Sequence, residues 1–376
     1  MWTPALSQFD FRPLGRVIFE AGSLARLGEI ARQLAGSHAL LVTDPGLKAS
    51  GHPQRAESFL REAGLAVTVF DGVKENPSEI EVAEGTARAK SAGIDLIVAV
   101  GGGSTMDCAK GINFVLTNGG KMADYWGHDK ASQPMLPSIG VPTTSGTGSE
   151  AQSYALISDP VTHRKMACGD KKAAFQVSIL DPDLTITQPR GVTAVTGIDA
   201  IAHAVESFVC TKANPYSRMA SSAAFRYLDT HFETVLKYPH DRQARAGMQI
   251  GSHFAGTAIE NAMLGIAHSL ANPLTAHFGT VHGAAVGLML PHVIRFNAKI
   301  VDRDYRELTG RSSDLLADRI LSLIRAAELP VQLRDLNIPN DTLPRLAREA
   351  KQQWTVTFNP RPATESDLLS LYEAAW

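Results

Sequence analysis

Hydrophobic residues in the first half of the chain follow two alternating patterns. Short aliphatic and β-branched runs, typical of buried strands, lie at His38–Thr43, Ala66–Phe70, Asp95–Val100 and Leu136–Val141. Stretches with helical spacing surround them at Ser23–Leu34, Gln54–Ala63, Glu79–Ala92 and Ser104–Thr117. Because parallel strands need a long crossover between them, this alternation predicts a parallel sheet covered by helices.

The strand pattern fades beyond about Gln188, where alanine-rich helical patterns take over. They cover Thr196–Val209, Ser217–Val235, Ala244–Ala271 and Asp314–Ala327. Prolines and aspartates between Asp181 and Pro189 interrupt both patterns. The sequence therefore predicts a Rossmann-like α/β domain over residues 1–187 and an all-helical domain over residues 188–376.

Composition narrows the class of protein. A chain of 376 residues has room for two domains. Thirty-six Lys and Arg balance thirty-eight Asp and Glu without a long basic block, which argues against nucleic acid as a partner. The apolar runs are shorter than the ~20 residues of a spanning helix, which argues against a membrane. Three scattered cysteines suit a reducing, cytoplasmic compartment and support no disulfide framework.

A glycine-rich loop follows the third predicted strand directly. Gly101, Gly102, Gly103 and Ser104 lead into a predicted helix, whose first N–H groups can bind an anion such as a pyrophosphate. Met106 occupies the third glycine position of the usual dinucleotide pattern, so that pattern is not met. A tight strand-to-helix turn is the alternative interpretation.

Polar groups follow two other predicted strands. Residues 142–150 carry five hydroxyls and two glycines, donors suited to ribose and phosphate oxygens, although such clusters also form solvated turns. Asp44 follows the first predicted strand, where a carboxylate binds a ribose 2′-hydroxyl and repels a 2′-phosphate. It favours NAD over NADP, unless it is simply a turn residue. Lys165 could bind a cofactor phosphate or hydroxyl, or be a surface lysine.

Several polar residues interrupt the apolar helices of the second half. Asp199 and His203 are four apart and share one helix face. His268 lies in a predicted apolar helix, and His282 opens the next apolar segment, with His277 between them. One carboxylate and three imidazoles suit iron, zinc or a similar divalent ion. Each residue alone is more often structural, so a metal site requires that they converge.

In these residues the chain resembles the iron-containing (group III) alcohol dehydrogenases, in the superfamily of glycerol dehydrogenase and dehydroquinate synthase. The shared stretches begin with Asn76-Pro77-Ser78, the Gly101–Ser104 loop with Asp107, and Pro142–Glu150. They continue with Gly197-Ile198-Asp199, His203, Glu206, Gly265–His268, His282-Gly283 and Asn359-Pro360-Arg361. The resemblance thus spans nearly the whole chain.

The resemblance implies a dehydroquinate synthase-like fold with specific site residues. Four match the metal positions: Asp199, His203, His268 and His282. Nine match positions that touch NAD(P): Asp44, Asn76, Gly102, Gly103, Ser104, Thr143, Thr144, Lys165 and Leu184. A Lewis-acidic ion lowers the pKa of an alcohol, and the nicotinamide accepts hydride. The family further implies a homodimer or higher homo-oligomer.

The chain departs from the family at two positions. Asn272 stands where many members have a histidine four residues after the third ligand, and asparagine cannot shuttle a proton near pH 7. We hypothesise that His277, or solvent through the cofactor ribose, takes over proton transfer. Thr105 replaces a frequent proline in the glycine loop.

The leading hypothesis is an NAD-dependent, iron-dependent alcohol dehydrogenase or aldehyde reductase acting on a small primary alcohol or aldehyde. One alternative is a zinc-dependent glycerol or polyol dehydrogenase, because the same donors bind Zn²⁺. A lyase of the dehydroquinate synthase kind would need several basic residues for a sugar phosphate, and these are few between Asp199 and His282. The alternative from another class is a non-catalytic nucleotide-binding protein with a vestigial site.

Overall fold

The computed structural model describes residues 9–162 and 164–376. Its contacts divide the chain into two compact units. The sheet unit comprises Arg12–Thr144 and Ser149–Gln188. The helical unit comprises Pro189–Trp376, residues 9–11 and the short segment Ser145–Gly148.

A six-stranded parallel sheet forms the centre of the sheet unit. Its strands in spatial order are β1 (Arg16–Phe19), β9 (Val177–Leu180), β6 (Ser138–Pro142), β4 (Leu96–Gly101), β2 (His38–Val42) and β3 (Ala66–Phe70). The predicted fold class, a parallel sheet followed by a helical region, is confirmed. The four predicted strands are present; β1 and β9, only four residues each, were not predicted.

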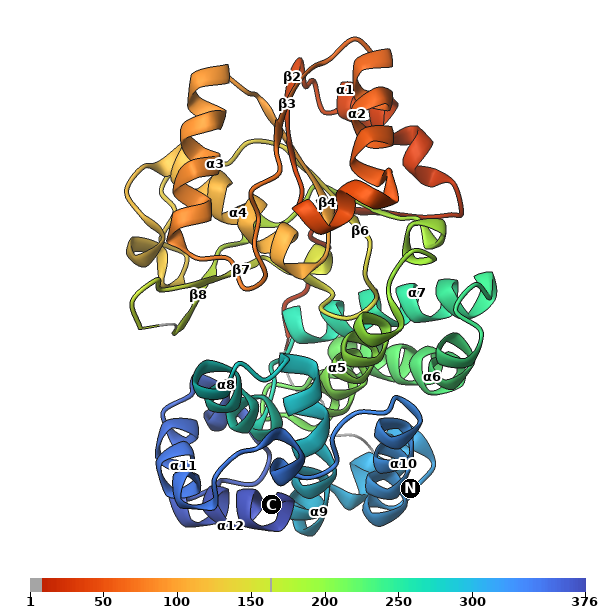
Figure 1. The fold of residues 1–376 in the computed structure, drawn as a ribbon, viewed down its shortest axis with the longest axis vertical. Coiled ribbons are helices and arrows are strands. Elements are labelled where there is room, and N and C mark those ends of the chain that lie inside the picture. The colour runs from red at the N-terminus through yellow and green to blue at the C-terminus, as the bar shows by residue number, and fades with distance from the viewer. Residues whose placement is uncertain (1–8, 163) are drawn as a thin grey trace. The chain divides into compact units, whose positions relative to one another are not determined.

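Helices cover both faces of this sheet (Figure 1). Leu96, Val98 and Val100 of β4 pack with α1 (Leu27–Gln33) and α2 (His52–Glu62). Ile97 and Ala99 point the other way and pack with α3 (Glu79–Ala92) and α4 (Gly103–Asn118). Because successive side chains of a strand face opposite sides, a continuous apolar run such as β4 serves both layers.

A small second sheet extends the layer of α3 and α4. Its strands are β5 (Gly127–His128), β8 (Lys165–Gly169) and β7 (Tyr154–Ser158), with β7 antiparallel to β8. Ala155, Ile157, Met166 and Cys168 bury one face of it in the same core as α4. These strands were not predicted, because only alternate residues in them are apolar and buried.

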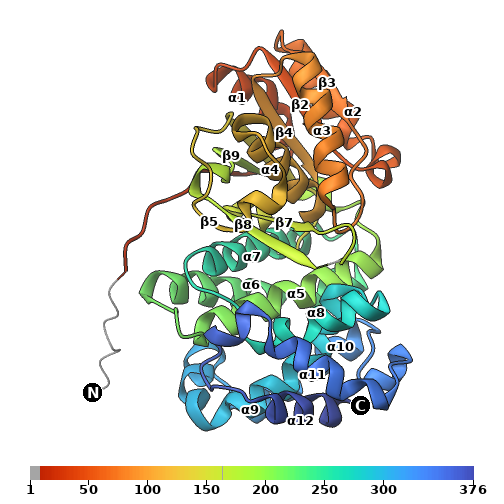
Figure 2. The same ribbon diagram turned by 90° about the vertical axis from the view of Figure 1, so that its left-hand side faces the viewer.

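One apolar core holds the helical unit together. Its helices are α5 (Arg190–Val209), α6 (Pro215–Lys237), α7 (Arg242–Glu260), α8 (Ile266–Phe278), α9 (His282–Thr309), α10 (Ser313–Ala326), α11 (Leu343–Lys351) and α12 (Glu365–Ala375). Figure 2 shows α5, α6 and α7 packed side by side. The segment Ser145–Gly148 packs on α5 and α7: an added Cβ at Gly148 would lie 2.6 Å from the Cα of Gly256.

The prediction of a single helix over Ala244–Ala271 is wrong. The structure has two helices there, since α7 ends at Glu260 and α8 begins at Ile266. Gly265 adopts φ −115° and ψ −148°, which breaks the helical path. The apolar pattern continues through the break, so the pattern alone could not reveal it. His268 is therefore the third residue of a helix rather than an interior one.

Among the residues that the structure describes, two helices are long and apolar enough to match a membrane span by composition. They are α5 and α9, and 83% and 67% of their most apolar windows are buried inside the protein. Burial on this scale is typical of core helices in a soluble protein. Both contribute residues to the single core of the helical unit.

The start of α3 shows how local sequence fixes an element beside the glycine loop. Ser78 caps the helix, and its N–H and hydroxyl both donate to Glu81, at 2.9 and 2.6 Å. The Lys74 ammonium lies 2.9 Å from the other carboxylate oxygen. Burial alone would raise the pKa of Glu81, but these hydrogen bonds lower it to about 2.

We predict that Glu81→Gln lowers the free energy of unfolding by about 1–2 kcal/mol at pH 7. Because the folded-state pKa is depressed, this stabilisation is complete above the unfolded value of 4.5 and is lost as pH falls toward about 2. Denaturant unfolding across this range should show the two curves converging in acid. Glu75→Gln, which removes an exposed carboxylate of the same loop, is the control; equal effects of both variants would contradict the prediction.

Candidate metal and cofactor sites

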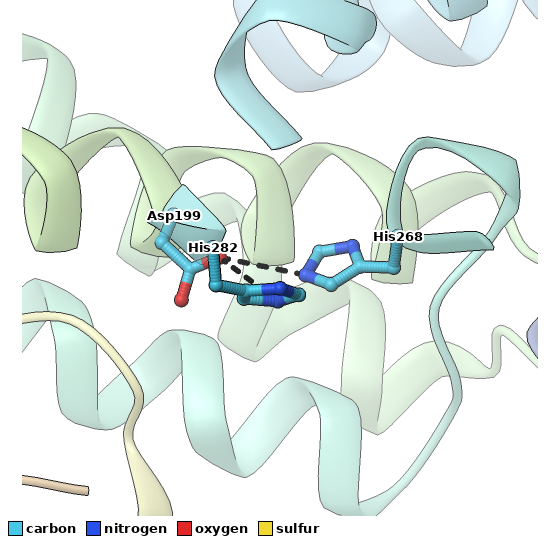
Figure 3. Close-up of side chains that lie close together, drawn as sticks. All are labelled: Asp199, His268 and His282. Atoms are coloured by element: carbon cyan, nitrogen blue, oxygen red, sulfur yellow. Dashed lines mark ion pairs between the residues drawn. The ribbon is translucent and has the colours of Figure 1, made fainter. Parts of the chain in front are cut away.

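Three helices of the helical unit bring the four predicted metal ligands together. Asp199 and His203 lie one turn apart on α5. His268 is in the first turn of α8, and His282 is the first residue of α9. Figure 3 shows Asp199, His268 and His282 pointing toward one another from these three elements.

Distances define a compact cluster around the Asp199 carboxylate. Oδ1 lies 3.5 Å from Nε2 of His268 and 4.0 Å from Nε2 of His282. Oδ2 lies 3.5 Å from Nε2 of His203. The ring of His203 stacks on that of His268, with centroids 5.0 Å apart. Asp199, His268 and His282 thus form one group whose donor atoms all lie within 4.8 Å of one another, whereas His203 approaches the other oxygen of the same carboxylate.

Close backbone packing makes this convergence possible. An added Cβ at Gly283 would lie 2.1 Å from the carbonyl oxygen of Val195 on α5 and 3.2 Å from the Cβ of Asp199. Only glycine allows the first turn of α9 to approach α5 so closely. The pair His282-Gly283 thus has a physical reason: the glycine brings the histidine against Asp199.

The cluster has the electrostatics of a buried carboxylate among imidazoles. Burial alone would raise the pKa of Asp199, but the three histidines hold it well below its usual range. Burial lowers the pKa of His203 to about 4. For His268, the carboxylates of Asp199 and Glu206 outweigh burial and raise the pKa to about 9. The carboxylate is therefore ionised at neutral pH, as a metal ligand must be.

The arrangement fits a divalent cation. Donors bound at about 2.1 Å in a tetrahedron lie roughly 3.4 Å apart, close to the separations observed here. Within the described residues, Asp199 Oδ1 and His268 Nε2 are buried and form no hydrogen bond. The His282 side chain is 26% exposed, which leaves one side open. A nitrogen and oxygen donor set with an open side suits Lewis-acid catalysis by iron or zinc.

The two candidate catalytic residues, Asn272 and His277, lie further along α8. Asn272, one turn after His268, donates to Gln353 Oε1 at 3.0 Å. His277 is nine residues after His268, about 13 Å further along the helix axis. Its Nε2 lies 2.5 Å from Glu349 on α11. This placement argues against His277 as the proton carrier, because its ring is far from the metal cluster and already paired.

In the sheet unit, the predicted cofactor residues gather at the carboxyl ends of the strands. The order of strands reverses between β2 and β4, because β3 lies beyond β2 while β6 lies beyond β4. Asp44 follows β2, and Gly102 follows β4 as the N-cap of α4. Ligands of open α/β sheets bind at such a reversal. Gly103 begins α4, whose first N–H groups face this edge.

Hydrogen bonds join the loops at this edge. The Asn76 N–H donates to Ser104 Oγ at 3.2 Å, and Asn76 has a left-handed φ of 52°. The Thr143 N–H donates to the Gly101 carbonyl at 2.9 Å. An added Cβ at Gly102 would lie 3.2 Å from Thr144 Cγ2. These contacts join the loops that follow β3, β4 and β6.

Asp44 also has a structural role. Its Oδ1 accepts from the Leu47 N–H at 3.2 Å and caps the 3₁₀ turn Pro45–Ser50. Its Oδ2 accepts from the Thr105 hydroxyl at 3.3 Å, a bond that proline at position 105 could not provide. The turn interpretation and the cofactor interpretation are thus compatible, since each oxygen has a further lone pair.

Two predicted cofactor residues differ in setting. Lys165 opens β8, opposite Ser158 of β7, and its charge acts on Asp107 of α4. Leu184 is fully buried in the sheet core, and its carbonyl accepts from His52 Nε2 at 3.1 Å. The Leu184 side chain is thus a core residue, so contact with a cofactor would have to involve its backbone.

Sequence reasoning assigned no role to Glu206, although it noted the residue within a shared stretch. Glu206 is buried and lies 2.5 Å from His268 Nδ1. Its spacing of three from His203 places both on one side of α5, which was the available signal.

Comparisons with known proteins identify the family of the chain. The family model described as iron-containing alcohol dehydrogenase matches residues 15–182, and its C-terminal counterpart matches residues 193–376. A 1,3-propanediol dehydrogenase of Klebsiella pneumoniae is 34% identical over 98% of this chain and 99% of its own. An NAD-dependent methanol dehydrogenase of Bacillus methanolicus is 31% identical over 94% of this chain and 96% of its own.

Solved structures give the same result. A crystal structure of a 1,3-propanediol oxidoreductase superposes with a TM-score of 0.94 at 34% identity, covering 98% of this chain and all of that one. The chain therefore belongs to the iron-containing alcohol dehydrogenases, a family of oxidoreductases that act on alcohols and aldehydes with NAD and iron.

Proposed function

We propose that the protein interconverts a small primary alcohol and its aldehyde with NAD, and that Asp199, His203, His268 and His282 hold the catalytic iron. The observation that supports this most is the convergence of the three imidazoles on one buried carboxylate. A vestigial site would have no reason to keep three imidazoles against the two oxygens of one buried carboxylate.

Iron and NAD supply the reactive chemistry. Iron, when bound, provides a Lewis acid that lowers the pKa of an alcohol, and NAD accepts hydride from the carbinol carbon. Oxidation of one alcohol thus yields one aldehyde, one NADH and one proton.

The residues of the chain bind and orient the metal and the coenzyme, and they exclude water. Burial of Asp199, His203 and His268 keeps solvent from three sides of the cluster, while the partly exposed His282 marks the open side. Neither Asn272 nor His277 is suited to carry the proton, so we propose that it leaves to solvent. For the coenzyme, Gly102, Gly103 and the hydroxyls of Ser104, Thr143 and Thr144 supply phosphate and ribose contacts.

We predict that His282→Ala loses the bound metal and that its kcat/KM falls by more than about a hundredfold. About a hundredfold is the upper range for mutation of a residue that only hydrogen-bonds to a metal ligand, so loss of a ligand itself should cost more. Metal content by elemental analysis and NADH absorbance after anaerobic loading with Fe²⁺ or Zn²⁺ would measure both effects and separate the two metals. The matched control is His277→Ala, a histidine of α8 paired with Glu349. It should keep metal, activity and pH–rate profile; a fully active, metal-loaded His282→Ala enzyme would refute the site.

We predict that Asp44→Asn lowers the preference for NAD over NADP by about tenfold or more, because it removes a repulsive charge but keeps the cap oxygen. The ratio of kcat/KM values for the two coenzymes is the measurement. Asp71→Asn, at the corresponding end of β3, should leave the ratio unchanged. An unaltered ratio in Asp44→Asn would show that Asp44 is only a turn residue.

We further propose a homo-oligomer in the cytoplasm. The three cysteines are buried free thiols, as suits a reducing compartment. Strand β1 lies at the end of the sheet, and its residues Val17 and Phe19 are 45% and 43% exposed. A second copy covering this edge would bury both.

Val17→Lys should then shift the molecular mass in light scattering from an oligomer toward the monomer, since a charge on the strand edge opposes pairing. Val161→Lys, at a highly exposed turn, is the control and should leave the mass unchanged. A monomeric wild-type protein would disprove the proposal.

A further inference from the structure

Both oxygens of the buried Glu206 carboxylate contact residues of α8. Glu206 lies on α5, one turn beyond His203, and is 3% exposed. Its Oε2 lies 2.5 Å from His268 Nδ1, and its Oε1 accepts from the Ala267 N–H at 2.7 Å. Within the described part of the chain, no lysine or arginine forms an ion pair with it. Its contacts are therefore with the imidazole and with the start of a helix.

The second contact fixes where α8 begins. The first N–H groups of a helix have no partner within it and attract negative charge. Glu206 accepts a hydrogen bond from the N–H of Ala267, and Asn359 Oδ1 lies 3.4 Å from the N of Ile266. An added Cβ at Gly265 would lie 2.9 Å from Glu206 Oε1 and 2.9 Å from Asn359 Oδ1, so any larger residue would displace these two oxygens. The backbone that carries His268 is thus held by Glu206.

The first contact fixes which imidazole nitrogen can bind a metal. An ionised carboxylate only accepts hydrogen bonds, so Nδ1 of His268 carries a proton. In the neutral ring the lone pair is then on Nε2, the atom that faces Asp199 Oδ1 at 3.5 Å. A carboxylate behind a histidine also makes the ring a stronger ligand.

We propose, on the basis of the metal site proposed above, that Glu206 is a positioning residue that makes His268 a metal ligand. It does so in two ways: it selects the Nε2-unprotonated tautomer, and it anchors the first turn of α8. The two actions can be separated by mutation. A glutamine at this position can still accept from the Ala267 N–H, but its amide would donate to Nδ1 and move the ring proton to Nε2.

The test is a Co²⁺ titration of metal-stripped full-length protein, followed by visible absorbance, with thermal unfolding of the same samples. Glu206→Gln should bind Co²⁺ about 10–100-fold more weakly, while its metal-free Tm stays close to wild type. Glu206→Ala should lose both affinity and Tm. The matched control is Glu349→Gln, which alters the other Glu–His pair of α8 and should leave Co²⁺ affinity unchanged.

Wild-type affinity in Glu206→Gln would overturn the inference while leaving the metal site intact. Co²⁺ binding by wild type that is not abolished in His282→Ala would instead overturn the proposed site, and the inference with it. If Glu206→Gln does not fold, NMR of ¹⁵N-histidine-labelled, Zn²⁺-loaded wild type decides the question. A protonated Nδ1 on His268 supports the role of Glu206, and a protonated Nε2 refutes it.

Discussion

The buried carboxylate of Asp199 is the constraint on which the helical unit depends. An ionised group out of water is costly unless opposite charge or hydrogen-bond donors compensate for it. Here three imidazoles from three helix segments surround it, so α5, α8 and α9 must meet at this point. The apolar core around the cluster is one continuous body, and it holds these segments in place. The stability of the core and the geometry of the site are therefore the same problem.

The coenzyme edge depends on a different constraint, the connectivity of a parallel sheet. Each strand must end at the same edge and turn back through a helix, so the loops after β2, β4 and β6 become neighbours although they are far apart in sequence. Asp44, the glycine loop and the threonines after β6 owe their proximity to this topology. Thr105 adds a local link between two of these loops through Asp44.

The fold was predictable where periodicity and burial coincide. The strand Ala66–Phe70 and the helix Glu79–Ala92 have the predicted bounds, because strong patterns end at clear caps there. Short or half-exposed strands such as β1 and β7 carry too little pattern to be recognised. The break before α8 could not be predicted, because it depends on Glu206 and Asn359, which lie 61 and 93 positions from the N–H groups they meet.

The candidate site was predictable in membership more than in arrangement. Family resemblance identified Asp199 and the three histidines that surround it, whereas spacing alone supported only Asp199 with His203. Neither the resemblance nor the spacing could show that His277 is turned toward Glu349 or that the Leu184 side chain is buried in the sheet core, because both depend on tertiary packing. The role of Glu206 requires its two bonds to be seen together.

The segment Ser145–Gly148 has a consequence for how such proteins can be divided. These four residues pack with the helical unit although both of their flanks belong to the sheet unit. A single recombination breakpoint near residue 188 would thus give a chimaera in which Ser145–Gly148 comes from one parent and the helices from the other. The mismatch would fall against α7, where Gly148 and Gly256 are in direct contact. Exchange of either half between relatives must transplant this strip as well, so the two halves are expected to have been inherited as one piece.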